Sequence, residues 1–210
     1  MNNRRFRRAS GAAILAVVLA TTAAACSNDD DASTNTSTSS SGVTTTGGGT
    51  SGAELPDDVN DADVAFVQGM IPHHEQAIEM SEMVIANGDD PTVIALAEQI
   101  NTAQGPEIDQ MNTWLDEWGI EPTGSDGMDG MDGMDGMMSD DEMNVMSDTM
   151  GADLDRMFLE MMIRHHEGAI QMAEVELDDG SNADVLALAR AIIDGQQAEI
   201  DQMQSMLDDT

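Results

Sequence analysis

The sequence of 210 residues is poor in cysteine, in basic residues and in aromatic residues. Its single cysteine, Cys26, excludes an internal disulfide, so the fold must be held together by core packing. Its 7 basic residues face 41 acidic ones, a balance that repels nucleic acid and attracts cations. No Gly-rich phosphate loop follows a strand-like segment, and no set of residues suited to nucleophilic catalysis is visible. The sequence therefore favours a cation-binding protein over a nucleic-acid-binding protein or a hydrolase.

A long hydrophobic run is also missing. The apolar run of residues 12–25 is too short and too rich in alanine for a good membrane span. Four arginines precede it, and small residues and Cys26 follow it, which resembles a bacterial lipoprotein signal. We expect a signal peptide over 1–25, lipidation of Cys26, and anchoring at the outer face of the cytoplasmic membrane. An ordinary secretory signal with an incidental cysteine stays open, as does export through the twin-arginine route.

The segment after Cys26 is rich in Ser, Thr and Gly, and it cannot bury enough apolar surface to offset its ordering entropy. We interpret residues 26–56 as a flexible tether and 57–210 as the folded domain. Cleavage before Cys26 would leave three arginines against all 41 acidic residues, a formal charge of −38. A solvated, salt-tolerant surface would explain this charge equally well.

An internal repeat organises the folded domain. Residues 66–117 align without a gap with residues 158–209, at a constant offset of 92. Each copy contains a segment of the form M-I-x-H-H-E-x-A-I-x-M, and later the string EIDQM. We place repeat one at 61–118, a Met/Gly/Asp-rich linker at 122–150 and repeat two at 152–208.

Each repeat is predicted to form two helices. Apolar residues recur at three- and four-residue steps, helix-stop signals separate the two halves, and no stretch alternates as a strand would. Two helix hairpins with one apolar face each bury that face best by pairing. The predicted fold is therefore an all-α four-helix bundle with approximate two-fold symmetry. Pro72 would kink the first helix or begin a new one.

All four histidines lie in the two copies of this segment. In each copy one methionine lies three residues before the first histidine, and another lies seven residues after it. The residues are Met70, His73, His74 and Met80 in repeat one, and Met162, His165, His166 and Met172 in repeat two. Thioether is a soft ligand that selects Cu(I), whereas imidazole suits several metals. A di-iron bundle would need Glu where this chain has Met70 and Met162. The pattern favours Cu(I), with Cu(II) able to bind the imidazoles; core filling by methionine is the alternative.

Other residues are predicted to assist. Gln104, Glu107, Gln196 and Glu199 lie on or beside the apolar stripes and could orient an imidazole. The linker, expected to be disordered, carries methionines at short spacing that could wrap a soft ion: Met128, Met131, Met134, Met137 and Met138. The alternatives to metal binding by these methionines are a low-complexity expansion and the scavenging of oxidants by methionine sulfoxide formation.

The paired histidine and methionine motifs, each followed by A-L-A and E-I-x-x-M, resemble the domain of unknown function 305 family over residues 61–207. The resemblance implies an exported bacterial protein with a ferritin-like helical bundle and a role in handling copper. It also implies a ligand set, carried over position by position. That set is Met70, His73, His74, Met80 and Met111, with Met162, His165, His166, Met172 and Met203.

Three functions compete. The leading one is a lipid-anchored copper-binding protein that sequesters the ion or relays it between a donor and an acceptor protein, without catalysis. The second is a ferritin-like metal oxidase, against which the missing Glu-x-x-His spacing counts. The third is a helical module that binds a protein partner and has no metal role.

Overall fold

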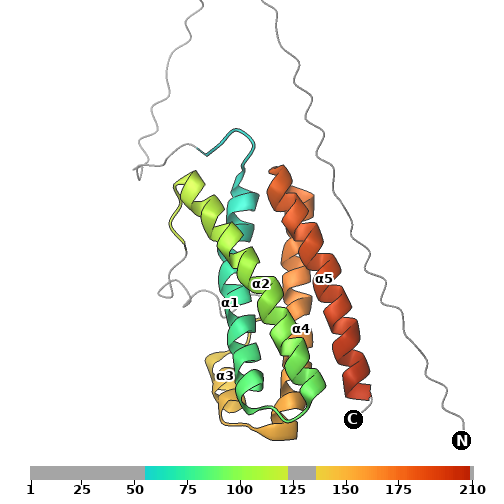
Figure 1. Cartoon of the computed structure of the whole chain (residues 1–210). Coiled ribbons are helices and arrows are strands. Elements are labelled where there is room, and N and C mark those ends of the chain that lie inside the picture. Colours follow the sequence, from blue (N-terminus) through green and yellow to red (C-terminus); the bar gives the residue numbers. More distant parts are fainter. Residues whose placement is uncertain (1–54, 123–135, 209–210) are drawn as a thin grey trace, which may run out of the picture. The chain divides into compact units, whose positions relative to one another are not determined.

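The computed structural model describes residues 55–122 and 136–208. These residues contain five α-helices and no strand: α1 (Asp61–Asn87), α2 (Pro91–Trp118), α3 (Asp140–Ser147), α4 (Gly151–Asp179) and α5 (Ala183–Asp208) (Figure 1). The all-α prediction is confirmed. No helix of the described part is long and apolar enough to cross a membrane.

Several predictions fall on residues outside the described part of the chain. They are the signal peptide at 1–25, the lipidation of Cys26, nearly all of the tether, and the linker residues Met128, Met131 and Met134. They stay predictions.

Local side chains explain where the helices begin. The side chain of Asn60 accepts hydrogen bonds from the first turn of α1, and the side chain of Asp63 accepts one from the backbone N–H of Asn60. Asp90 caps α2, which has a proline at its first position, and Asn182 accepts from the first backbone N–H groups of α5. Gly119 ends α2 at φ 67°, a left-handed conformation that glycine adopts without strain.

The four long helices form two hairpins that pack together as a bundle. Helix α1 packs on α2, α4 packs on α5, and α1 packs on α4 across the interface between the repeats (Figure 1). The internal repeat thus appears in space as two similar hairpins, which confirms the predicted four-helix bundle.

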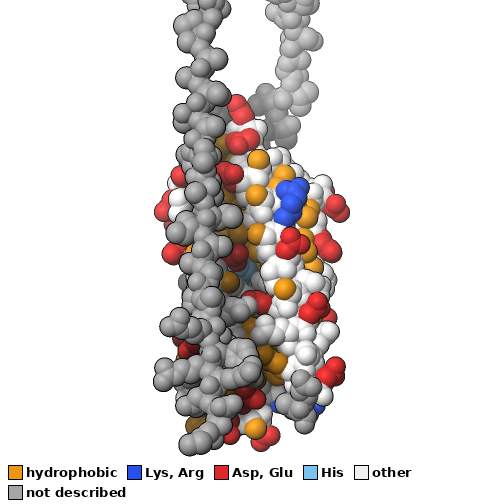
Figure 2. All heavy atoms as spheres, turned by 45° about the vertical axis from the view of Figure 1, so that its right-hand side comes forward, with side chains coloured by type: hydrophobic (Ala, Val, Ile, Leu, Met, Phe, Trp, Pro, Cys, Tyr) orange, Lys and Arg blue, Asp and Glu red, His pale blue; other side chains and the backbone are white. Residues whose placement is uncertain are grey.

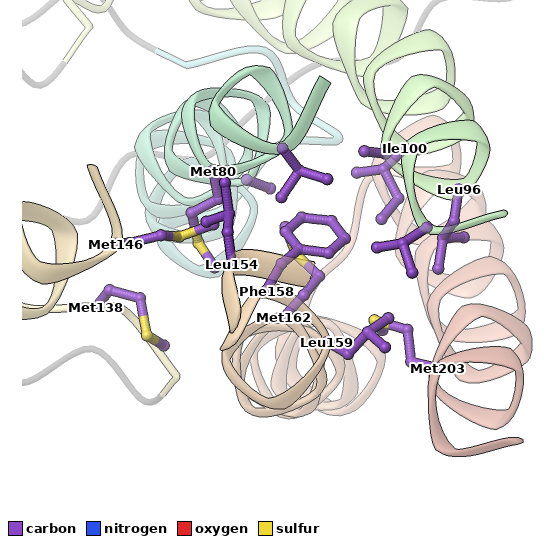
Figure 3. Packing of buried hydrophobic residues seen from close by; sticks show 14 of the residues in the cluster. Met80, Leu96, Ile100, Met138, Met146, Leu154, Phe158, Leu159, Met162 and Met203 are labelled. Carbon is purple, nitrogen blue, oxygen red and sulfur yellow. The ribbon is translucent and has the colours of Figure 1, made fainter. Parts of the chain in front are cut away.

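The core consists of two hydrophobic clusters, one toward each end of the bundle. The α3-side cluster joins the C-terminal half of α1 and the N-terminal half of α4, with residues such as Val84, Leu154 and Phe158 (Figure 3). The distal cluster joins the opposite halves of these helices, with residues such as Phe66 and Ala173. Helices α1 and α4 are therefore antiparallel, and the middle of the bundle lies between the two clusters.

The part of the linker that the structure describes is folded, contrary to the expectation of disorder. Residues 140–147 form α3, capped by a reciprocal pair of hydrogen bonds between Ser139 and Glu142. Met138 and Met146 are buried in the α3-side cluster (Figure 3). The sequence pattern concealed this because a Gly/Asp background suggested that the methionines had no core to join.

Pro72 does not begin a new helix, because α1 runs through it from Asp61 to Asn87. The proline has no N–H, so one hydrogen bond of the helix is lost at this point. The equivalent residue in repeat two is Arg164, which leaves α4 free of proline.

A carboxyl pair joins the hairpins at the distal end. Asp63 of α1 accepts hydrogen bonds from the backbone N–H groups of Ser181 and Asn182, which connect α4 to α5. Glu176 of α4 is 1 % exposed, and burial, followed by the neighbouring Asp63 carboxylate, raises its pKa to about 8. Asp155 makes the matching contact at the other end, with Asp89 and Asp90, but there the residue equivalent to Glu176 is Val84.

Candidate metal centre

A layer of polar side chains crosses the middle of the bundle between the two hydrophobic clusters. We call it the polar layer, and it consists of His73 and His74 of α1, Gln104 and Glu107 of α2, His165 and His166 of α4, and Gln196 and Glu199 of α5. All four histidines are 0 % exposed. Burying so many polar groups is costly unless they are paired, so this layer is the part of the core that packing alone does not explain.

Two histidines from different repeats meet at the interface between α1 and α4. The ring centroids of His73 and His165 lie 3.8 Å apart, with an angle of 45° between the ring planes. The two residues are equivalent in the internal repeat, so they meet near the approximate two-fold axis of the bundle. This contact brings imidazoles from both hairpins into one buried place.

The other histidine of each pair contacts a glutamate of its own hairpin. Nε2 of His74 lies 2.8 Å from Oε2 of Glu107, and Nε2 of His166 lies 2.8 Å from Oε2 of Glu199. A carboxylate on Nε2 favours the tautomer with its proton there, which leaves the lone pair on Nδ1. In both rings Nδ1 is buried without a hydrogen-bond partner. The predicted orienting role of the two glutamates is therefore consistent with the geometry.

The two glutamates differ in their surroundings. The side chain of Glu107 is 24 % exposed, whereas that of Glu199 is 10 % exposed. Glu199 also accepts a hydrogen bond from Gln99 of α2 at 3.3 Å, and the residue equivalent to Gln99 in repeat two is Ala191. The two halves of the polar layer are thus similar and not identical.

The two glutamines of the layer do not complete its hydrogen bonds. Gln104 and Gln196 are 2 % and 4 % exposed. Both polar atoms of the Gln104 amide and Oε1 of Gln196 are buried without a hydrogen-bond partner. Unpartnered buried polar atoms are rare in folded proteins, and here they lie in the same layer as the Nδ1 atoms of His74 and His166.

Methionines lie on both sides of the polar layer. The α3-side cluster contains Met80, Met162 and Met203, which are 0 % exposed (Figure 3). The distal cluster contains Met70 and Met111, also 0 % exposed, with the partly buried Met172 packed against it. Because α1 and α4 are antiparallel, each set of three draws on both repeats. All six belong to the ligand set that the resemblance implied.

The electrostatics of the layer favour the neutral form of His165 and His166. Burial, reinforced by the neighbouring ring of His73, holds the pKa of His165 well below its usual range. Burial also lowers the pKa of His166, although the contact with Glu199 opposes that effect. Neutral imidazole is the form that binds metal ions, so these rings need not lose a proton before they act as ligands.

Histidines and acidic residues alone do not form a metal cluster in the described part of the chain. Among the described residues, no three His, Cys, Asp or Glu side chains come together closely enough to hold a metal ion. Methionine sulfur and the glutamine amides are the further donors that lie in or beside the layer with the imidazoles. Imidazole nitrogen and thioether sulfur together match the preferences of Cu(I).

The structure also places the predicted residues of the linker. Met137 is partly buried and Met138 is buried, so neither side chain is fully exposed to solvent. Sequence reasoning did not foresee the burial of Met146, although its place one turn after Met143 in a short capped segment was a weak helical signal.

The surface around the bundle is strongly acidic. Figure 2 shows acidic side chains spread over the visible face, with few basic ones among them. Such a field raises the local concentration of cations at the surface.

Comparison with known proteins identifies the family. The family model described as a domain of unknown function, DUF305, matches residues 63–207. The chain belongs to this family. The match includes both histidine pairs and every methionine of the two sets beside the polar layer, which confirms the resemblance seen in the sequence.

Solved structures of DUF305 proteins have the same fold. A fragment from Deinococcus radiodurans is 33 % identical, with a TM-score of 0.67, and the match covers 72 % of this chain and 99 % of that one. A protein from Streptomyces coelicolor, provisionally described as secreted, is 34 % identical, with a TM-score of 0.65 and coverage of 70 % of this chain and 93 % of that one.

A sequence relative is a viral protein of Acanthamoeba polyphaga mimivirus. It is 44 % identical over 55 residues, which are 26 % of this chain and 36 % of the viral one.

CopM is a further similar structure. Its Cu(II)-bound form is 32 % identical to this chain, with a TM-score of 0.62, and the match covers 70 % of this chain and 96 % of CopM. CopM has also been solved with Cu(I) and with silver. Copper binding is thus found in a protein that shares this fold and about a third of the aligned residues.

Proposed function

We propose that this protein is an exported, lipid-anchored copper-binding protein that sequesters Cu(I) or Cu(II) or relays it, in copper tolerance or homeostasis. The observation that carries the proposal is the polar layer itself. Four buried imidazoles lie between two sets of buried methionines, with the Nδ1 atoms of His74 and His166 lacking a partner. The copper and silver forms of CopM support the choice of metal.

The donor chemistry favours cargo binding over catalysis. The two carboxylates of the layer, Glu107 and Glu199, are each engaged by a histidine. A di-iron oxidase uses several carboxylates as direct ligands. Nitrogen and sulfur donors are left for the ion, and they hold Cu(I) without providing a carboxylate-rich redox centre.

Each residue has a proposed role. The imidazoles supply nitrogen, and the methionine sets supply sulfur from either side of the layer. Glu107 and Glu199 fix the orientation of the His74 and His166 rings, and Gln104 and Gln196 supply amide groups within the same layer. A lipid on Cys26 would keep the protein at the outer face of the cytoplasmic membrane, and the linker methionines would pass ions to the bundle.

An anaerobic Cu(I) titration against a chromophoric chelator tests the proposal. A form beginning at Ala53 is compared with a variant in which His73, His74, His165 and His166 are all changed to Ala, and with Met150→Leu as a control. Met150 is 68 % exposed and lies outside both methionine sets. Tight binding that only the histidine variant loses supports the proposal.

A second pair of variants covers the case in which four alanines prevent folding. Met70→Leu and Met162→Leu preserve the volume of the core, so the bundle should keep its circular dichroism spectrum. Weaker Cu(I) binding by both variants would support thioether ligation in the layer. Unchanged binding by the histidine variant and both methionine variants would refute the assignment.

A further inference from the structure

A surface pocket lies between α1 and the segment that leads into α3. Its volume is about 540 Å³. Its lining includes Pro72, Glu75 and Glu79 of α1, with Met137, Asp140 and Met143 from the opposite side. Among the residues that the structure describes, no Lys or Arg lines it. The pocket therefore combines three carboxylates with two thioethers and lacks a competing positive charge.

Hydrogen bonds fix the two walls of this pocket to each other. The amide of Gln76 donates to the backbone carbonyl of Met138 at 2.8 Å and accepts from the backbone N–H of the same residue at 2.7 Å. Gly136 has a φ of +88°, and a Cβ there would come within 2.9 Å of Gly168 in α4. Glycine suits both the positive φ and the close approach to Gly168. The segment therefore packs directly on α4, and its contacts with Gln76 keep Met137 at the pocket.

The rest of the second wall is anchored by burial. Met146 is 0 % exposed and Met138 is 5 % exposed, and both insert into the α3-side cluster (Figure 3). Met143 is partly buried and packs against the same cluster. Met143 therefore both packs against the core and lines the pocket.

The opposite flank of the same segment carries an ion pair. Arg164 of α4 donates from Nη2 to the sulfur of Met138 at 2.7 Å and pairs with Glu142. Arg164 is the counterpart of Pro72 in the internal repeat, so one flank has a guanidinium where the other has the pocket. The guanidinium of Arg164 is thus engaged by Glu142 and does not line the pocket.

We propose that this pocket is a separate binding site for a soft monovalent cation, with Met137 and Met143 as sulfur ligands and Glu75, Glu79 and Asp140 as its attracting charges. Thioethers select Cu(I) and Ag(I), whereas the carboxylates raise the local concentration of any cation. The site is more exposed than the polar layer and binds its ion more weakly.

The position of the pocket suggests its use. Pro72 lines it and directly precedes His73, which lies in the polar layer. The wall of the pocket and the polar layer therefore adjoin along α1, at Pro72 and His73. The site serves as the place where the ion first binds before it reaches the layer, a role that rests on the proposed function, whereas cation binding in the pocket does not.

Methyl-¹³C methionine and ¹⁵N histidine spectra recorded during an Ag(I) titration of the form beginning at Ala53 test this site. Silver serves as an air-stable probe for Cu(I). We expect the histidine signals to change first, in slow exchange, and the methyl signals of Met137 and Met143 to move afterwards, in fast exchange. Leucine variants assign the methyl signals.

The outcomes separate the two proposals. Movement of Met137 and Met143 without histidine changes supports the pocket and refutes the histidine layer. Histidine changes with both methyl groups unmoved refute the pocket and leave the proposed function standing. A spectrum that does not respond to Ag(I) at all refutes both.

The order of binding is tested by the rate of loading. We expect Met137→Leu combined with Met143→Leu to abolish the second phase of the titration and to slow Cu(I) uptake from a chelator about tenfold, with the final occupancy of the layer unchanged. Glu75→Gln should also slow uptake at low salt. Its matched control is Glu167→Gln, the exposed equivalent on α4 that does not line the pocket. Equal rates in all these variants would overturn the entry role.

Discussion

Glu176→Val tests the carboxyl pair at the distal end of the bundle. The substitution places in repeat two the residue that repeat one has at the equivalent position, Val84. Val84 is buried beside its own turn, so the bundle already accommodates valine in this environment. The change therefore removes a buried carboxyl with little risk of a packing defect.

The size of the effect on the free energy of unfolding follows from the pKa of Glu176. This pKa is raised from 4.5 to about 8, mainly by burial and secondly by Asp63. The folded state keeps a proton on Glu176 in the pH range where the unfolded state has lost it. Its stability therefore falls as the pH rises from about 4.5 to about 8, and it levels off above that. At about 1.36 kcal/mol for each pH unit, the full effect would be about 5 kcal/mol. Because the pair lies at the end of the bundle, water will reduce this to about 2–4 kcal/mol.

The expected result changes sign with pH. At pH 9 Glu176→Val should be more stable than the natural protein by about 2–4 kcal/mol, because it removes a buried charge beside Asp63. At pH 5 it should be less stable by about 1 kcal/mol, because the protonated carboxyl can donate a hydrogen bond to Asp63 and valine cannot. Glu176→Gln is the matched control, since its amide can donate at every pH.

Urea unfolding followed by far-ultraviolet circular dichroism at pH 5, 7 and 9 measures these differences. Comparing each variant with the natural protein at the same pH removes the contributions of the other titrating groups. If the stability difference between Glu176→Val and the natural protein were the same at all three pH values, Glu176 would not be protonated in the folded state, and the reasoning would be refuted.

Three further predictions follow from other contacts. Glu107→Gln and Glu199→Gln should each weaken Cu(I) binding about tenfold, because the outer imidazoles lose their orienting carboxylates; equal affinity in a chelator competition would refute that role. Met146→Ala should lower the free energy of unfolding, measured in urea, by about 2–4 kcal/mol, and Met146→Leu by less than about 1.5 kcal/mol. A change near zero for the alanine variant would mean that α3 is not packed into the core. Gln76→Ala should speed hydrogen exchange in α3, since both contacts with Met138 are lost, and unchanged exchange would show that burial alone holds the segment.

Most of the fold could be predicted from the sequence because the signals were redundant. The repeat, the helical periodicity and the stop signals all indicated two hairpins, and the structure has them. Helix α3 was missed because it has only eight residues and is surrounded by Gly and Asp. Its stability comes from the burial of Met138 and Met146, a tertiary effect that local propensity does not reveal.

The candidate site was predictable in composition but not in arrangement. The spacing put both histidine pairs on helices, and the offset of 92 made them equivalent. It could not show that His73 and His165 touch, because that contact depends on the antiparallel packing of α1 and α4. Nor could it show that Met172 is only partly buried while its counterpart Met80 is fully buried.

X-ray absorption at the copper K edge of the Cu(I)-loaded protein can show whether the polar layer holds the metal. It reports the oxidation state and the kinds of atom bound to the metal. We expect Cu(I) with both imidazole nitrogen and thioether sulfur as ligands, and loss of the imidazole signal when His73, His74, His165 and His166 are replaced. A spectrum with sulfur ligands alone, or with oxygen ligands alone, would contradict the assignment of copper to the polar layer.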